Sequence, residues 1–238
     1  VRRMDYSIQI SKLFYERFMN EEEITLISPH MAPGLYEAFG TEDFDDLYLK
    51  YEADKTIPKK TVPAQDLFFD LLKERAETGR IYIMNLDHCN SHSSFKDKVS
   101  MSNLCQEITL PTTPIQHIDD AEGEIALCIL SAVNVGALND LGELENICDL
   151  SVRALEQIID YQDYPVRAAE VSTKKRRSLG IGYIGLAHYL AKNGVKYSDP
   201  EAWALVDRLT EAFQYHLLRS SCDIAMEKGK CEGFERTK

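Results

Sequence analysis

Hydrophobic residues recur at helical spacing in five stretches of the chain. The clearest covers residues 63–78, and Gly79 stands where such a helix would end. A second helix is predicted over residues 41–51, with Thr41 as its N-cap. The last third of the chain predicts three more helices, over residues 144–161, 179–190 and 202–226.

Shorter apolar runs predict β-strands between these helices. Residues 6–18 are expected to form a strand end that runs into a helix. Further strands are predicted over residues 24–27, 80–84, 103–110 and 124–130, and a polar loop over residues 87–94. Because strands followed by helices favour a mixed core, the predicted fold class is α/β, strand-rich over residues 1–135 and helix-rich over residues 136–238.

Composition and charge narrow the classes of function. The chain has 238 residues, of which 44% are hydrophobic, and 27 Lys and Arg stand against 39 Asp and Glu, a formal net charge of −12. Such an acidic surface argues against general binding to nucleic acid or to an anionic membrane, since both are polyanions. No apolar stretch is long enough to span a bilayer, and residues 1–6 lack an apolar signal core. We expect a cytoplasmic protein and, because position 1 is not Met, a piece of a longer chain.

The cysteines do not form a recognisable pair along the sequence. There are six, at positions 89, 105, 128, 148, 222 and 231, and no two are spaced as C-x-x-C. This spacing does not indicate a zinc ribbon or a thioredoxin-type motif. Reduced cytoplasmic thiols are therefore expected, some of them with a catalytic role.

The predicted strand at residues 103–110 combines three chemically useful side chains. Because strand side chains alternate between faces, Asn103, Cys105 and Glu107 would point the same way, about 7 Å apart per pair. A thiyl radical on the cysteine could abstract hydrogen from a carbon that bears oxygen, and the carboxylate could deprotonate the adjacent hydroxyl. Spacing alone favours the simpler alternative of a half-buried strand with a satisfied Asn and an inert Cys.

The sequence of residues 102–108, Ser-Asn-Leu-Cys-Gln-Glu-Ile, resembles the radical-cysteine motif of ribonucleotide reductase large subunits. Residues 109–112 resemble its continuation in the bacterial and phage aerobic enzymes, class Ia. Similar blocks occur in order along the chain, at residues 79–83, 87–90, 124–128, 130–134, 161–165 and 177–182.

This resemblance implies a fold and a role for each motif residue. The fold would be part of a ten-stranded α/β barrel over residues 1–238, with the radical cysteine on a loop inside it. Cys105 would take the 3′-hydrogen of a ribonucleoside diphosphate, Glu107 would deprotonate the 3′-hydroxyl, and Asn103 would hydrogen-bond the substrate. Leu104 and Gln106 would complete the substrate-contacting stretch.

The resemblance also implies a role for Cys128. It would be one of two thiols that reduce the 2′-position and end as a disulfide, with the partner thiol upstream of Val1. The residues alone favour a core position for Cys128, because it stands in the apolar run Ile-Ala-Leu-Cys-Ile-Leu.

The implied cofactors and partners all lie outside the chain. The radical would come from a small (beta) subunit with a tyrosyl radical and a di-iron centre, and no metal or cofactor would bind this chain directly. Thioredoxin or glutaredoxin would act as reductant. Since the upstream cysteine, the regulatory domain, the relay tyrosines and the C-terminal cysteine pair are not seen, we expect turnover only with the remaining segments of the large subunit.

Three alternatives stay open on the sequence. One is a cobalamin-dependent (class II) ribonucleotide reductase, which shares the Asn-x-Cys-x-Glu arrangement. Another is a thiol–disulfide protein that uses Cys105 and Cys128. The third is a non-catalytic piece retained for assembly with a partner.

Other signals carry less weight. Residues 180–185 spell G-x-G-x-x-G, but residues 174–178 before them are basic rather than strand-like, so helix packing explains these glycines better than dinucleotide binding. His88, Cys89 and His92 lack a fourth zinc ligand. The basic run 174–177 is expected to be a solvated face. No role is assigned to Cys89, Cys148, Cys222 or Cys231.

Overall fold

The computed structural model describes residues 4–238; residues 1–3, part of the predicted non-apolar start, lie outside the described residues. The chain packs as two compact units. The first ends at Thr112 and also takes in Lys238, and the second covers Thr113–Thr237. Both units mix helices with strands, which confirms the predicted α/β class, and no sheet of the described residues closes into a barrel.

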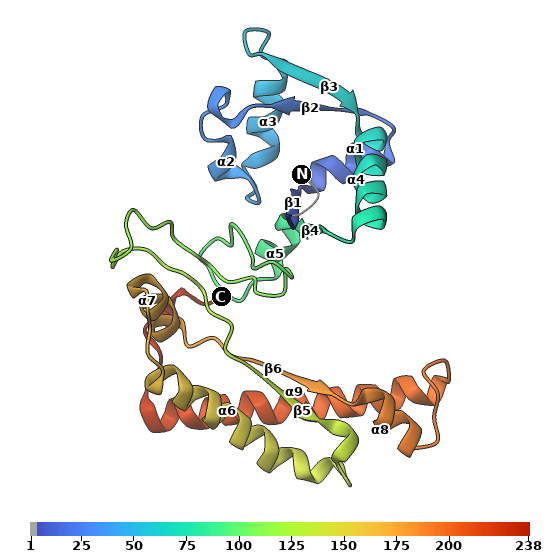
Figure 1. Cartoon of the computed structure of the whole chain (residues 1–238), viewed down its shortest axis with the longest axis vertical. Helices are drawn as coiled ribbons and strands as arrows, with labels where there is room; N and C mark the ends of the chain where they lie inside the picture. Colours follow the sequence, from blue (N-terminus) through green and yellow to red (C-terminus); the bar gives the residue numbers. More distant parts are fainter. Residues whose placement is uncertain (1–3) are drawn as a thin grey trace. The chain divides into compact units, whose positions relative to one another are not determined.

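The first unit contains two separate two-stranded sheets (Figure 1). Strand β1 pairs in parallel with β4, whereas β2 pairs with β3 in antiparallel fashion. In chain order its elements are β1 (Tyr6–Ile10), α1 (Lys12–Met19), β2 (Glu23–Ile27), a 3₁₀ turn (Pro29–Met31), α2 (Leu35–Ala38), α3 (Phe44–Ala53), β3 (Lys59–Pro63), α4 (Ala64–Thr78), β4 (Ile81–Asn85) and α5 (Leu86–His92).

Local signals explain most of these elements. Ser11 accepts a hydrogen bond from the Phe14 backbone N–H and so caps α1, and Gly79 ends α4 with φ +68°. The main core of the unit gathers apolar side chains from its sheets and helices, among them Ile10, Phe14 and Phe44. The structure confirms the predicted strand and helix within residues 6–18. It also confirms the strands at residues 24–27 and 80–84 and the helix at residues 63–78.

Two predictions in the first unit are wrong in detail. Helix α3 starts at Phe44 with Asp43 in the cap position, while the Thr41 hydroxyl donates to the Ala38 carbonyl instead. The polar loop predicted at residues 87–94 is largely helix α5, which packs Leu86 into a small core with Met84. A single buried Leu is too weak a pattern to reveal a helix of two turns.

The second unit is a parallel strand pair packed against long helices (Figure 1). Helices α6 and α9 lie side by side, and Leu144, Cys148, Leu209 and Phe213 from them form a core with Val133 of β5. In chain order its elements are β5 (Leu130–Asn134), 3₁₀ turns (Val135–Ala137 and Leu141–Glu143), α6 (Leu144–Tyr161), α7 (Arg167–Arg176), β6 (Gly180–Ile184), α8 (Leu186–Lys192), α9 (Pro200–Lys228) and a last 3₁₀ helix (Glu232–Arg236).

The helices predicted at 144–161 and 202–226 are confirmed, but the one at 179–190 is wrong in its first half. Residues 180–184 form strand β6, and only α8 after them is helical. Gly185 turns the chain with φ +81°, and a Cβ there would clash with Asn134 Oδ1. A turn, not helix packing, therefore accounts for Gly185.

No helix between residues 4 and 238 combines the length and apolarity needed to cross a bilayer.

Candidate active site

Cys105 lies on a turn, not on a strand. The Gln106 backbone N–H donates to the Asn103 carbonyl at 3.2 Å, which closes a four-residue turn with Leu104 and Cys105 at its centre. Gln106 has φ +69°, a left-handed conformation that non-glycine residues rarely adopt. The predicted strand over residues 103–110 is therefore wrong, and with it the alternation that was to align the three side chains.

The Asn103 side chain holds this turn together. Its Oδ1 accepts hydrogen bonds from the Ile108 backbone N–H at 3.0 Å and from the Ser102 hydroxyl at 3.1 Å. Among residues 4–238, its Nδ2 has no hydrogen-bond acceptor within reach. Asn103 thus fixes the loop through its side-chain oxygen.

Gln106 folds back onto the same turn. Its Nε2 donates to the Asn103 carbonyl at 3.1 Å, which adds to the backbone bond that closes the turn. Its Oε1 is buried and has no hydrogen-bond partner among the described residues. A buried acceptor without a hydrogen-bond donor lowers the stability of the folded loop.

The side chains that carry the predicted chemistry face outward from this turn. Cys105 and Glu107 are exposed, and Leu104 is 52% exposed. The structure therefore brings Asn103, Cys105 and Glu107 together on one short loop, with the thiol and the carboxylate accessible.

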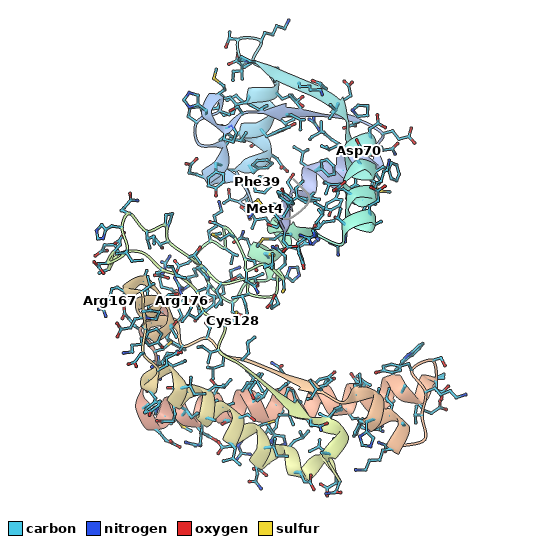
Figure 2. The ribbon with its side chains drawn as sticks, viewed as in Figure 1. Met4, Phe39, Asp70, Cys128, Arg167 and Arg176 are labelled. Atoms are coloured by element: carbon cyan, nitrogen blue, oxygen red, sulfur yellow. The ribbon has the colours of Figure 1, made fainter. Side chains whose placement is uncertain are left out.

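Cys128 lies in the second unit, on the extended segment that leads into β5 (Figure 2). Residues 125–129 form no strand, so the strand predicted over 124–130 is wrong apart from its last residue. Cys128 is exposed, which also contradicts the core position favoured by its apolar neighbours. The apolar side chain that enters the core here is that of Ile129, packed with Leu155 and Ile159.

A buried ion cluster lies at the start of this segment. Glu124 Oε2 accepts from Arg176 Nε at 2.9 Å and Nη2 at 2.7 Å, and Glu124 Oε1 pairs with Lys175. The Glu124 and Arg176 side chains are only 6% and 4% exposed. Burial acts to raise the pKa of Glu124, but the hydrogen bonds from Lys175 and Arg176 outweigh it and hold that pKa below its usual value.

The basic run 174–177 is therefore not a solvated face. Arg176 is buried against Glu124, Arg177 binds Glu156 and Asp160, and only Lys174 is exposed, paired with Glu170. Figure 2 shows Arg167 and Arg176 at the two ends of α7. Sequence reasoning missed this cluster, although the single carboxylate Glu124 at the head of an apolar run was a signal for it.

The four cysteines without an assigned role differ in accessibility. Cys148 is fully buried, and burial raises the pKa of its thiol to about 11, which makes it unreactive at neutral pH. Burial also raises the pKa of Cys89. Cys222 is exposed on α9, and the Cys231 thiol lies 3.7 Å from the Arg176 carbonyl.

The described residues contain no group of three or more His, Cys, Asp or Glu that could hold a metal ion. The rings of His88 and His92 lie 6.2 Å apart in T-shaped contact, and His92 Nδ1 is 3.0 Å from the His88 carbonyl. This pair therefore packs within α5.

Comparison with known proteins decides the family. The family described as "ribonucleotide reductase, barrel domain" matches residues 1–238. The chain belongs to the ribonucleotide reductase family. The barrel to which the resemblance pointed is therefore confirmed as the fold family.

The names of similar proteins agree with this family. The chain is 56% identical over 242 residues to the ribonucleoside-diphosphate reductase subunit alpha of Haemophilus influenzae, and 52% identical to the ribonucleoside-diphosphate reductase 1 subunit alpha of Escherichia coli. The subunit alpha of enterobacteria phage T4 is 39% identical over 246 residues. Each match covers 100% of this chain and 32% of the relative, so the chain spans about a third of the length of these proteins. The predicted likeness to large subunits is confirmed.

Proposed function

We propose that this ribonucleotide reductase chain supplies the radical cysteine and one reducing thiol for the conversion of ribonucleoside diphosphates to 2′-deoxyribonucleoside diphosphates in the cytoplasm. The observation that carries the proposal is the turn at residues 103–107, which presents an exposed thiol between an amide donor and an exposed carboxylate. The names of the relatives, all reductase alpha subunits, support the substrate class.

Abstraction of the 3′-hydrogen, the first step of the reaction, is assigned to the turn at residues 103–107. A thiyl radical on Cys105 takes the 3′-hydrogen, so that an S–H bond forms and a carbon radical remains at C3′. Glu107 accepts the 3′-hydroxyl proton, and Asn103 donates through Nδ2 to the oxygen on which charge develops. Leu104 offers apolar surface to the substrate, and Gln106 completes the stretch that contacts it.

The reduction itself is assigned to Cys128 and a second thiol. The two thiols supply two electrons and two protons and become a disulfide; one proton leaves with the 2′-hydroxyl as water, and the other is added at C2′. Cys105 then returns its hydrogen to C3′ and is again a thiyl radical, and Glu107 returns its proton to the 3′-oxygen. Thioredoxin or glutaredoxin would reduce the disulfide, and the di-iron tyrosyl radical of a small subunit would generate the thiyl radical.

The test of this function is an assembly assay. The chain is combined with the remaining segments of a large subunit and with a small subunit, and deoxyribonucleotide formation is measured. Product is expected from the complete set only, since the chain spans about a third of its relatives. Activity that instead requires adenosylcobalamin would favour the class II alternative, and no product with either addition would refute the proposal.

The two ends of the Asn103 amide allow a second prediction. Asn103→Asp keeps the acceptor for Ile108 N–H but loses the Nδ2 donor, whereas Asn103→Ala loses both. Turnover should fall in both variants. Amide hydrogen exchange at Ile108 should rise only in the alanine variant, about fivefold for a hydrogen bond worth about 1 kcal/mol.

This comparison separates loop closure from substrate binding. If the aspartate variant turned over as fast as the unmodified chain, the Nδ2 donor would have no part in the reaction. If Ile108 exchanged equally fast in the alanine variant and the unmodified chain, Asn103 would not be what closes the loop.

A further inference from the structure

The segment that carries Cys128 is fixed at both ends. At the start, Glu124 forms a two-way backbone bridge with Thr113, at 3.0 and 3.1 Å, and the Ile125 N–H donates to the Ala168 carbonyl of α7 at 3.1 Å. At the other end, Ile129 is buried and its carbonyl accepts from Gly180 N–H at 2.9 Å. Only residues 126–128 lie between these fixed points, and Cys128 is exposed among them.

At the start of the segment, a buried ion pair between the side chains of Glu124 and Arg176 adds to the backbone hydrogen bonds. Arg176 approaches Glu124 Oε2 with two nitrogens, and Lys175 occupies Oε1, so both carboxylate oxygens are engaged. Arg176 is the last residue of α7, whose Ala168 carbonyl receives the Ile125 N–H near the other end of the helix. Backbone and side-chain contacts thus attach the same short segment to both ends of one helix.

Whether Cys128 can form a disulfide depends on the position of the backbone at residues 124–129. Two cysteines can be joined only when their Cα atoms are about 4.4–6.8 Å apart with suitable directions. A misplacement of about 1 Å can slow a reaction about 100-fold, even when its cause lies away from the reacting atoms. A cysteine that must meet both a second thiol and a substrate carbon therefore needs a fixed backbone.

We propose that Glu124 and Arg176 are positioning residues for the Cys128 thiol: their buried ion pair holds the segment at α7 so that Cys128 can reduce the substrate. The inference rests on the proposed function in that it takes Cys128 as a reducing thiol. It assigns no contact with substrate to either residue.

The variants Glu124→Gln and Arg176→Lys test this role. Removing one partner of a buried pair is destabilising, so the lysine variant, which keeps the positive charge, is the milder change. Glu156→Gln is the matched control. Glu156 is a second buried carboxylate of this unit, and it binds Arg177 at 2.8 Å rather than residues 124–129.

Two steps are measured in the assembled enzyme during a single turnover without added reductant. In complete turnover Cys105 returns its hydrogen to C3′, so tritium from 3′-tritiated substrate reaches solvent only when abstraction occurs and the reduction by Cys128 is delayed. Deoxyribonucleotide formation reports on the reduction itself. We expect Glu124→Gln and Arg176→Lys to slow product formation about 10- to 100-fold and to raise the tritium released per product formed. Glu156→Gln should leave this ratio of tritium to product unchanged.

A second measurement needs no turnover. Amide exchange at Ile125, which donates to Ala168, should rise at least about tenfold in both variants, whereas exchange in the α6–α9 core should not. The proposal is overturned if Ile125 exchange is unchanged, or if product formation slows with no rise in tritium released per product, as a general loss of folded protein would cause. Failure of the proposed function is distinguishable, because the unmodified enzyme would then form no product.

Discussion

Replacing Cys105 by serine is expected to abolish deoxyribonucleotide formation in the assembled enzyme, by at least about 1,000-fold, or about 4 kcal/mol of transition-state stabilisation. The reason is chemical: a serine hydroxyl holds its hydrogen too strongly for an alkoxyl radical to replace the thiyl radical. The fold should be unaffected, because Cys105 is exposed at the centre of a turn closed by Asn103 and Gln106. No tritium should reach solvent from 3′-tritiated substrate, because no 3′-hydrogen is abstracted.

The control for this experiment is Cys222→Ser. Cys222 is also exposed but lies on α9, where no part of the reaction is assigned. The Cys222→Ser variant should form deoxyribonucleotide as fast as the unmodified enzyme. Unchanged product formation in the Cys105 variant would support the alternative of a non-catalytic piece that only assembles with a partner.

The elements that could be predicted from the sequence are those whose cause is local. Helix α4 ends at Gly79 because a left-handed residue there lets the Gly79 N–H reach the Arg75 carbonyl. Helix α6 has the predicted bounds because its apolar side chains repeat at helical spacing and meet a core. In both, residues within one or two turns decide the outcome.

The loop at Cys105 could not be predicted from alternation. Residues 103–110 alternate like a strand, but the Asn103 side chain accepts the Ile108 N–H that a neighbouring strand would otherwise bind. Such side-chain-to-backbone bonds compete with secondary structure, and the residue pattern does not show which one will form. Family resemblance supplied the loop, and the structure supplies the bonds that close it.

The cluster around Glu124 escaped prediction for another reason. Glu124 and Arg176 are 52 positions apart, and neither belongs to a pattern that names the other. The basic run 174–177 looked like a solvated face because charge runs usually are. Burial of Arg176 depends on an acidic partner that only the folded chain brings to α7.

Replacing Cys128 by serine is expected to block reduction but not hydrogen abstraction. Serine cannot supply electrons to the 2′-position or form the disulfide, so product should again fall at least about 1,000-fold. Tritium should be released from 3′-tritiated substrate without product, because Cys105, on a different loop and in a different unit of the chain, still abstracts the hydrogen and cannot return it in a completed turnover. The thiol is exposed, so the substitution should leave the core formed by Ile129, Leu155 and Ile159 intact.

The pair of cysteine variants therefore divides the reaction into its two halves. Neither tritium nor product in Cys105→Ser, and tritium without product in Cys128→Ser, would match the roles proposed for a radical thiol and a reducing thiol. The thiol–disulfide alternative predicts a different pattern, in which a disulfide between Cys105 and Cys128 forms without nucleotide. Thiol titration of the unmodified chain, with and without a ribonucleoside diphosphate, distinguishes the two, because the reductase requires substrate for each oxidation.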